Sequence, residues 1–521
     1  MTSTEPGTPN ELVAENEALR EENQRLKEEN ALLRKALYGT SSEKMEKPPE
    51  TESQPATSSE NQNEAIGRDR EKPEGYESSE GQEENRVPEG GARPGRRRAP
   101  EHLPRERQEF HLSGNDLVCS CGCTLTEIGE DVSEQVTLEP VKHKVLERVK
   151  KKYACKGCGK TVRTAKAPPS ILPGTTYGSP EFCAHMVTAK CHYGLPFYRQ
   201  EMLLHEENIP IDRTTLARMA MNLGEACEPL WLRLKEELHK QDIAHADETT
   251  FQVLKEPGRK PETDSWLWQY RSVHRAEHPV VVFEYQMTRA GEHPRNFFEI
   301  DIPEPDIQFR LRYLHADAYA GYNGVKGMCR VGCWAHARRK FSDALSLMPE
   351  AMRPETIAQR VMELIQQLYA IEEKAKTLSA EERKNLRDAE AQPVLDQIKA
   401  ILDHEVGNVA PKSATGKAIK YTLGQWEALT AYLLDGRLSI DNNISEREIK
   451  AFVIGRKNWL FADTQRGATS LAILYSLVRT AVANGLNPYK YLKHIFTELP
   501  KMTRADEVTD LLPWNLKSTL K

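Results

Sequence analysis

Three acidic residues stand far apart in the sequence, each in a distinctive phrase. Asp247 lies in "HADET", Asp317 lies in the parallel phrase "HADAY", and Glu446 lies in "DNNISEREIKAFVIGRKNWLF". Carboxylates that meet in a fold repel one another, and a bound cation is the usual compensation. Such oxygen ligands suit Mg²⁺, and a pair of these ions can activate the attacking oxygen and stabilise the leaving oxygen when a phosphodiester is cut. Taken alone, aspartates are also common where a strand meets a turn.

Glu446 has a purely local alternative role. The run Asn443-Ile444-Ser445-Glu446 fits a capping box, in which the Glu446 carboxylate would reach back to the backbone N–H of Asn443. A helix cap contributes about 0.5 to 2 kcal/mol without any metal. Both interpretations stay open from this stretch alone.

Basic residues follow Glu446 closely and suit contact with a nucleic-acid backbone. The side chains expected to hold phosphate are Arg447, Lys450, Arg456 and Lys457. Arg447 could instead be the partner of an acidic residue of the site, and Lys450 could lie on a solvated face. Trp459 could stack on a base, although tryptophan is more often part of the core.

The elements that must position these acids begin at residue 243. Three β-rich runs, "IAHADETTFQVL", "SWLWQYRSV" and "PVVVFEYQ", predict a meander. A helix over "AGEHPRNFFEI", a strand in "FRLRYLHADAY", a further helix and a strand near 328–334 would follow. In that order, which fits a ribonuclease-H-like sheet, the first and fourth strands lie side by side. Asp247 and Asp317 would then project from one end of the sheet.

Five cysteines fall in two tight groups, which in a reducing compartment indicates metal rather than disulfides. The phrase "CSCGC" is followed by "CKGC", and two such knuckles can supply four thiolates to a structural Zn²⁺. The candidate ligands are Cys119, Cys121, Cys123, Cys155 and Cys158. The first knuckle offers three sulfurs where two suffice, so the pair that binds there stays open.

The N-terminal region predicts self-association and DNA contact. Leucines recur every seven residues from Leu12 to Leu33, with asparagines at the other seam position, which is typical of a short coiled coil, although a solvated single helix is the alternative. A polar segment without a core follows and ends in a basic patch that contains Arg96, Arg97 and Arg98. Residues 196–220 resemble a helix-turn-helix capped by Asp212 or Thr214, although a generic helical pair is equally compatible.

Composition limits the function classes. The chain has 521 residues and a net charge of −6, with its acids concentrated in the first hundred residues and basic clusters further on. No apolar run approaches the roughly 20 residues of a membrane helix, and the start has no secretory pattern, so a cytoplasmic protein without a membrane partner is expected.

Several phrases together resemble the insertion-sequence-66 type of bacterial transposase. They are "HADET", "HADAYAGYN", "CWAHARRKF", "DNNISEREIKAFVIGRKNWLF", "LYGTSSEK" and the cysteine knuckles. The resemblance implies a DDE transposase in which Asp247, Asp317 and Glu446 bind Mg²⁺ or Mn²⁺, with a helical insertion before Glu446. The implied partners are transposon ends and target DNA, a second copy or a higher synaptic assembly, and small accessory proteins. Cys333-x-x-His336 is similar to a motif with a structural role, and a zinc site there is less expected without a second ligand pair.

The expected fold is α/β (α+β, multi-domain) with a ribonuclease-H-like catalytic core. Its expected parts are a coiled-coil dimerisation helix (1–40), a disordered linker with the basic patch (41–108), a zinc-binding ribbon (109–168), a helix-turn-helix-like DNA-binding region (169–240), the first part of the core (241–339), a helical insertion (340–437), the catalytic helix and basic motif (438–466) and a C-terminal helical region (467–521). The alternatives are a zinc-dependent DNA-binding regulator without catalysis and a repair or recombination nuclease.

Overall fold

The computed structural model describes residues 143–147, 149, 151–154, 162–164, 167–273, 275–299, 311–504 and 506–520. The expected coiled coil, linker, arginine patch and five clustered cysteines lie outside these residues. The chain divides into two units, of which residues 43–165 form one. Within that unit, β1 (Lys152–Ala154) pairs antiparallel with β2 (Val162–Thr164).

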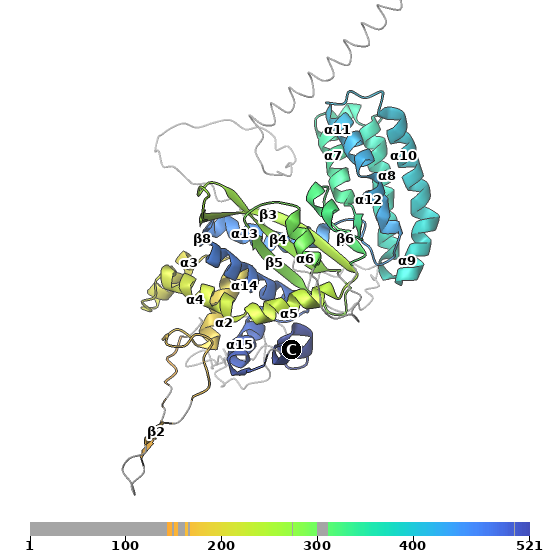
Figure 1. The fold of residues 1–521 in the computed structure, drawn as a ribbon. Helices are drawn as coiled ribbons and strands as arrows, with labels where there is room; N and C mark the ends of the chain where they lie inside the picture. The colour runs from red at the N-terminus through yellow and green to blue at the C-terminus, as the bar shows by residue number, and fades with distance from the viewer. Residues whose placement is uncertain are drawn as a thin grey trace, which may run out of the picture. The chain divides into compact units, whose positions relative to one another are not determined.

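The larger unit is built on a mixed sheet with the order β5-β4-β3-β6-β7, and β8 pairs with the far end of β3 (Figure 1). The strands are β3 (Ile243–Lys255), β4 (Asp264–Ser272), β5 (Val281–Gln286), β6 (Tyr313–His315), β7 (Cys329–Val331) and β8 (Ala462–Thr464). The predicted succession of three strands, a helix (α6, Glu292–Phe298) and two further strands is confirmed, except that a 3₁₀ turn, Ala320–Gly324, replaces the second helix. The protein is therefore a mixed α/β fold.

Two long helices lie along this sheet (Figure 1). α13 (Asn443–Trp459) contacts β3 and β4, and α14 (Gln465–Ala483) contacts β5. Side chains of α14 also bind backbone groups of β5 on the edge that no strand pairs with. Ser476 Oγ accepts from the N–H of Phe283 (2.7 Å), and Thr480 Oγ1 accepts from the N–H of Val281 (3.0 Å). Hydroxyls on a helix thus occupy positions that a neighbouring strand would otherwise fill.

Helices from both ends of this unit pack together around α14. They are α2 (Pro180–Cys191), α3 (Phe197–Glu206), α4 (Arg213–Ala226), α5 (Glu228–His239) and α15 (Pro488–Glu498). The Asp212 carboxylate caps α4 by accepting from Thr215 N–H (2.8 Å), which confirms one of the two predicted caps. α4 approaches α14 so closely that a Cβ on Gly224 would lie 2.6 Å from Ser470 Cα. None of the described helices has the length and apolar composition of a membrane span.

The chain between β7 and α13 forms a helical group with its own core. Its helices are α7 (Trp334–Ser346), α8 (Ile357–Lys374), α9 (Ala380–Leu386), α10 (Gln392–Glu405), α11 (Ala414–Gly424) and α12 (Trp426–Thr430). α12 contacts β7, and Gly332 N–H donates to the Ala428 carbonyl (2.8 Å).

Arg387 is the buried polar hub of this helical group. Its guanidinium forms a two-pronged ion pair with Glu372 on α8, at 2.7 and 2.6 Å. It also donates to the carbonyls of Tyr432 and Leu438, both at 2.9 Å. Arg387 therefore joins α8 to the segment that leads into α13.

We expect Arg387→Ala to lower the free energy of unfolding of the helical group by about 3 to 5 kcal/mol, because removing one partner leaves a buried charge and several carbonyls unpaired. Lys384→Ala, which removes an exposed pair with Asp388, is the control and should cost less than about 1 kcal/mol. Denaturant unfolding measures both values. Equal stability of the two variants would show that Arg387 is not the hub.

Candidate active site

The two aspartates lie at equivalent positions on neighbouring parallel strands. β3 pairs with β6 in a register that sets His245 opposite His315, and their rings stack with centroids 4.3 Å apart. Asp247 follows His245 two residues later within β3, where side chains two apart share a face, and Asp317 lies two residues beyond the end of β6. The repeated "HAD" phrase therefore places both carboxylates at one level of the sheet, as expected for the first and fourth strands.

Asn442 and Ser439 fasten the segment before α13 to this histidine pair. His245 Nδ1 lies 2.8 Å from Asn442 Oδ1, and Asn442 Nδ2 donates to the carbonyl of Ala246 (2.9 Å). His315 Nε2 accepts from Ser439 N–H (3.2 Å). Burial lowers the pKa of His245 to about 3 and the pKa of His315 well below its usual value, so both rings are neutral and stack without charge repulsion.

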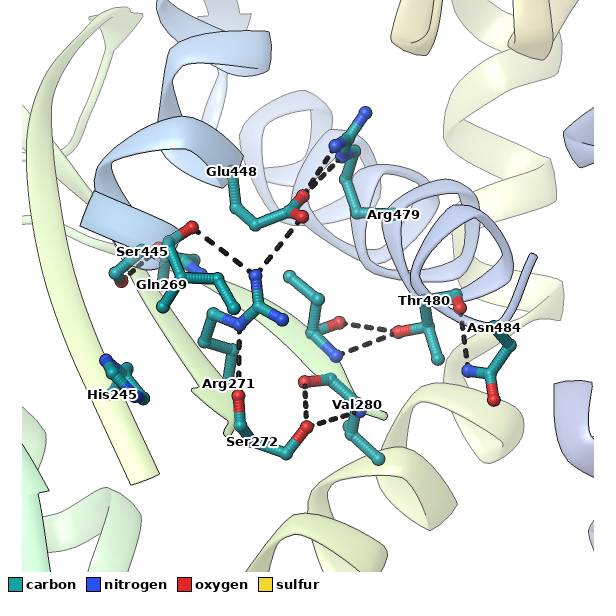
Figure 2. A network of polar contacts seen from close by, with 12 residues as sticks. His245, Gln269, Arg271, Ser272, Val280, Ser445, Glu448, Arg479, Thr480 and Asn484 are labelled. Carbon is teal, nitrogen blue, oxygen red and sulfur yellow. Dashed lines mark hydrogen bonds and ion pairs between the residues drawn. The ribbon is translucent and has the colours of Figure 1, made fainter. Parts of the chain in front are cut away.

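A second set of contacts anchors the opposite side of α13 (Figure 2). Ser445 Oγ donates to Gln269 Oε1 on β4 (2.7 Å). Glu448 accepts from Arg271 on β4 (3.2 Å) and from Arg479 on α14 (2.7 Å), and all three side chains are largely buried. Because these anchors fix the rotation of α13, they determine which way the residues between them face.

Glu446 points into a pocket of about 230 Å³ together with the two aspartates. The polar residues that line this pocket are Asp247, Asp317, His336, Asn442, Glu446 and Lys450. The capping-box alternative for Glu446 is wrong, because the N–H of Asn443 is bound by Asp441 Oδ1 (3.1 Å) instead. Glu446 Oε1 is buried and has no hydrogen-bond partner among the described residues.

The pocket concentrates negative charge. Burial raises the pKa of Asp247 well above its usual range, and the charges of Glu248, Asp317 and Glu446 raise it further. The backbone N–H of Glu248 donates to Asp247 Oδ1 (2.9 Å) and opposes this shift. Burial also raises the pKa of Glu248, whose carboxylate accepts from Arg289 Nε (2.8 Å).

The chemistry of this donor set suits a divalent cation, although the oxygens of Asp247, Asp317 and Glu446 do not all lie within 4.8 Å of one another. Carboxylate oxygens are the hard ligands that Mg²⁺ and Mn²⁺ prefer. Asp247, Asp317 and Glu446 come from three elements, face one pocket and repel one another, and Glu446 offers a buried oxygen without a partner. A bound cation would relieve the repulsion that raises the pKa of Asp247.

The basic residues of α13 divide into two groups. The exposed group consists of Arg447, Lys450 and Lys457. Arg447 makes no hydrogen bond or ion pair within the described part of the chain, so its alternative role as partner of an acidic residue has no support there. Arg456 differs, because it is half-buried and donates to Thr250 Oγ1 (2.9 Å). Trp459 is partly buried against the core and packs edge-on against Phe452, at 5.3 Å between ring centroids.

Sequence reasoning missed the residues that connect these elements. Asn442 and Glu448 were visible only as polar neighbours of Glu446, and no pattern indicates their partners on β3, β4 and α14. Helical spacing was the available signal, because Glu448 lies two residues from Glu446 and therefore faces away from it. Glu248 was likewise hidden inside "HADET".

Comparisons with known proteins agree with one another. The family model described as "Transposase IS66 family" matches residues 175–470, and "IS66 C-terminal element" matches residues 476–514. The "zinc-finger binding domain of transposase IS66" matches residues 116–159, a range that contains all five clustered cysteines. A model described as "Transposase C of IS166 homeodomain" matches residues 25–107.

Relatives from Sinorhizobium fredii cover most of the chain. The "Uncharacterized protein y4jD" is 30% identical over 426 residues, which are 80% of this chain and 81% of that protein. The "Uncharacterized protein y4qI" is 30% identical over 448 residues, which are 80% of this chain and 79% of that protein. No solved structure matches the chain.

The raised pKa of Asp247 predicts a pH-dependent effect on stability. A carboxyl group whose pKa is higher in the folded state favours folding below its unfolded pKa, near 3.8, and loses that contribution as pH rises through the folded value. We therefore expect Asp247→Asn to raise the melting temperature at neutral pH without divalent metal, and the gain to shrink toward about pH 4. Melting curves across this range test it. A gain that is absent or independent of pH would contradict buried charge repulsion at Asp247.

Proposed function

The chain belongs to the IS66 transposase family, and we propose that it is a DDE-type transposase. It would cut DNA strands at the ends of an insertion sequence and transfer the freed 3′-hydroxyls to target DNA. The observation that carries this proposal is the convergence of Asp247, Asp317 and Glu446 on one pocket, from two in-register strands and the helix above them.

The sheet and helices support a ribonuclease-H-like core with an insertion. β3 and β6 are adjacent and parallel, β4 and β5 extend the sheet antiparallel, and α13 returns to β3 after the helical group. The core would comprise residues 241–339 and 438–466, with 340–437 as the insertion and 467–521 as a packing region.

The three acidic residues share one role in this proposal, which is to bind metal. Asp247, Asp317 and Glu446 would hold divalent cations, Mg²⁺ or Mn²⁺, against the scissile phosphate. A cation bound there supplies Lewis-acid activation of the attacking oxygen and charge stabilisation of the leaving oxygen. Water attacks phosphorus in the first step and releases a 3′-hydroxyl. That hydroxyl attacks a target phosphodiester in the second step, so one P–O bond replaces another and no covalent protein intermediate forms.

Four features would bring DNA to the pocket. The exposed cations Arg447, Lys450 and Lys457 continue from the pocket along α13, and Arg456 of the same helix donates to Thr250 on β3. Electrostatic contact with phosphates positions DNA without reading its sequence. Recognition of the element's end would come from residues 169–240, from a Zn²⁺-binding ribbon over 109–168 with ligands among Cys119, Cys121, Cys123, Cys155 and Cys158, and from Arg96, Arg97 and Arg98.

Pairing of two ends requires at least two active sites in one assembly. A coiled coil over residues 1–40 would join two copies, and residues 41–108 would link it to the ribbon. Small accessory proteins of the same element are a further proposed partner.

We expect Glu446→Gln to lower metal-dependent strand cleavage at least about 1,000-fold. The amide keeps the size of the side chain but removes the charge that holds the metal. A bound metal lowers the activation free energy by several kcal/mol, and each loss of about 1.4 kcal/mol slows the reaction about tenfold. Glu363→Gln, on the exposed side of α8, is the matched control and should cleave normally. A nicking assay on DNA carrying the element's end, with Mg²⁺ titrated, measures both.

Normal cleavage by a folded Glu446→Gln variant would remove Glu446 from the mechanism. Absence of cleavage in the unaltered protein, with intact binding of element ends, would favour the DNA-binding regulator instead. Cleavage without strand transfer would favour a nuclease of repair or recombination.

Lys450 tests the proposed DNA path. We expect Lys450→Ala to weaken binding of all DNA sequences to a similar extent and to lower the slope of log K against log salt by about 1, because one phosphate contact is lost. Lys376→Ala, an exposed lysine after α8, is the control and should leave the slope unchanged. Fluorescence anisotropy across a salt series measures the slope. An unchanged slope for Lys450→Ala would place the DNA elsewhere.

A further inference from the structure

Glu446 faces a second set of metal-binding atoms besides the two aspartates. Cys333 Sγ, one ring nitrogen of His336 and a Glu446 carboxylate oxygen all lie within 4.8 Å of one another. Cys333 caps the start of α7, His336 lies in the first turn of that helix, and Glu446 comes from α13. This is the one such group of three or more potential ligands within the described ranges. The third ligand that the sequence did not reveal is therefore supplied by the fold.

Two of the three ligand atoms are buried without hydrogen bonds. His336 Nδ1 and Glu446 Oε1 are both buried atoms with no hydrogen-bond partner among the described residues. They face one another at 3.7 Å, which is too long for a hydrogen bond. Buried polar atoms are nearly always satisfied, and a cation between this nitrogen and oxygen would satisfy both.

Burial raises the pKa of the third ligand atom, the Cys333 thiol, to about 12, so a metal ion bound there would have to displace its proton. Cys333 Sγ accepts from the N–H of Asn442 (3.2 Å), which partly opposes this shift. It also lies at the N-terminus of α7, a 13-residue helix, where the helix dipole favours negative charge. The C-x-x-H spacing sets the sulfur and the imidazole on the same side of this first turn.

We propose that Cys333, His336 and Glu446 form a second metal site that takes a thiophilic divalent cation such as Zn²⁺. A thiolate, an imidazole and a carboxylate together suit Zn²⁺ or Co²⁺, whereas Mg²⁺ prefers oxygen ligands alone. Three protein ligands leave a fourth position open, and His336 lines the same pocket as Asp247, so the site is reached from the pocket.

Sharing of Glu446 gives the site a regulatory consequence. A Zn²⁺ ion held by Cys333 and His336 would draw the Glu446 carboxylate toward α7 and away from Asp247 and Asp317. Zn²⁺ would then inhibit cleavage that depends on Mg²⁺. The inhibition rests on the proposed transposase function, but the binding of the metal does not.

The binding test uses the full-length protein with its own zinc content, titrated with Co²⁺, whose thiolate complexes absorb in the near ultraviolet. We expect a thiolate–Co²⁺ band in the unaltered chain and its loss in Cys333→Ser. Cys329→Ser, on neighbouring β7 and half-buried, is the matched control and should keep the band. Cys155→Ser should lose the zinc, or the Co²⁺ absorption, of the proposed ribbon and should keep the band that depends on Cys333.

His336→Gln provides a second variant in case the buried serine disturbs folding, because His336 is more exposed than Cys333. We expect its Co²⁺ affinity to fall by at least about 100-fold, more than the usual effect of a residue that only supports a ligand. Co²⁺ binding that is the same in unaltered protein, Cys333→Ser and His336→Gln, with all three folded by circular dichroism, would overturn the proposal.

A second experiment tests the inhibition by Zn²⁺. For each protein, the rate of strand cleavage with Zn²⁺ is divided by the rate without Zn²⁺ at the same Mg²⁺ concentration, and this ratio is compared between proteins. We expect Zn²⁺ to lower the ratio at least tenfold in the unaltered protein and much less in His336→Gln, and excess Mg²⁺ to restore it. Equal inhibition in both proteins would overturn the shared use of Glu446. A Co²⁺ band in a protein that never cleaves DNA would support the metal site while contradicting the transposase proposal.

Discussion

The parallel pairing of β3 with β6, in register at His245 and His315, is the constraint on which the pocket depends. It can exist only if two buried imidazoles stay neutral, because two charged rings 4.3 Å apart in a dry interior would repel strongly. Burial keeps the ring of His245 neutral, and Asn442, which belongs to the segment that starts α13, lies within hydrogen-bond distance of that ring. The contact between Asn442 and His245 thereby holds the helix that carries Glu446 against the strand that carries Asp247.

Contacts on the side of α13 that faces away from the pocket hold the helix in place, although the carboxylates on its pocket side repel one another. Carboxylates crowded into a partly buried pocket destabilise the fold, as the raised pKa of Asp247 indicates. Two arginines held on Glu448 clamp the same helix from behind (Figure 2). Buried ion pairs add little net stability, but they specify one geometry when every group is satisfied. The clamp therefore defines the rotation of α13 at the point where a carboxylate must meet two others.

Local pattern was enough to predict the strand order and the meeting of the two aspartates, because the "HAD" phrase repeats in both strands and parallel neighbours align. It was not enough for Glu446, since a capping box and a site residue have the same spacing. The structure distinguishes the two roles, because Asp441 accepts the hydrogen bond from the Asn443 N–H that Glu446 would have accepted in a capping box. The partners of Asn442 and the approach of Glu446 to Cys333 depend on contacts across the fold, which leave no periodic signal in the sequence.

Both borders of the sheet are closed by side chains and helices rather than by further strands. Ser476 and Thr480 occupy the open amide groups of β5, while α12 and the bond from Gly332 cover the side of β7. A second copy has no free strand edge at these points on which to add its own backbone, so domain swapping and amyloid-like stacking are disfavoured there. Two copies that meet at these borders can therefore stay separate, without their sheets fusing.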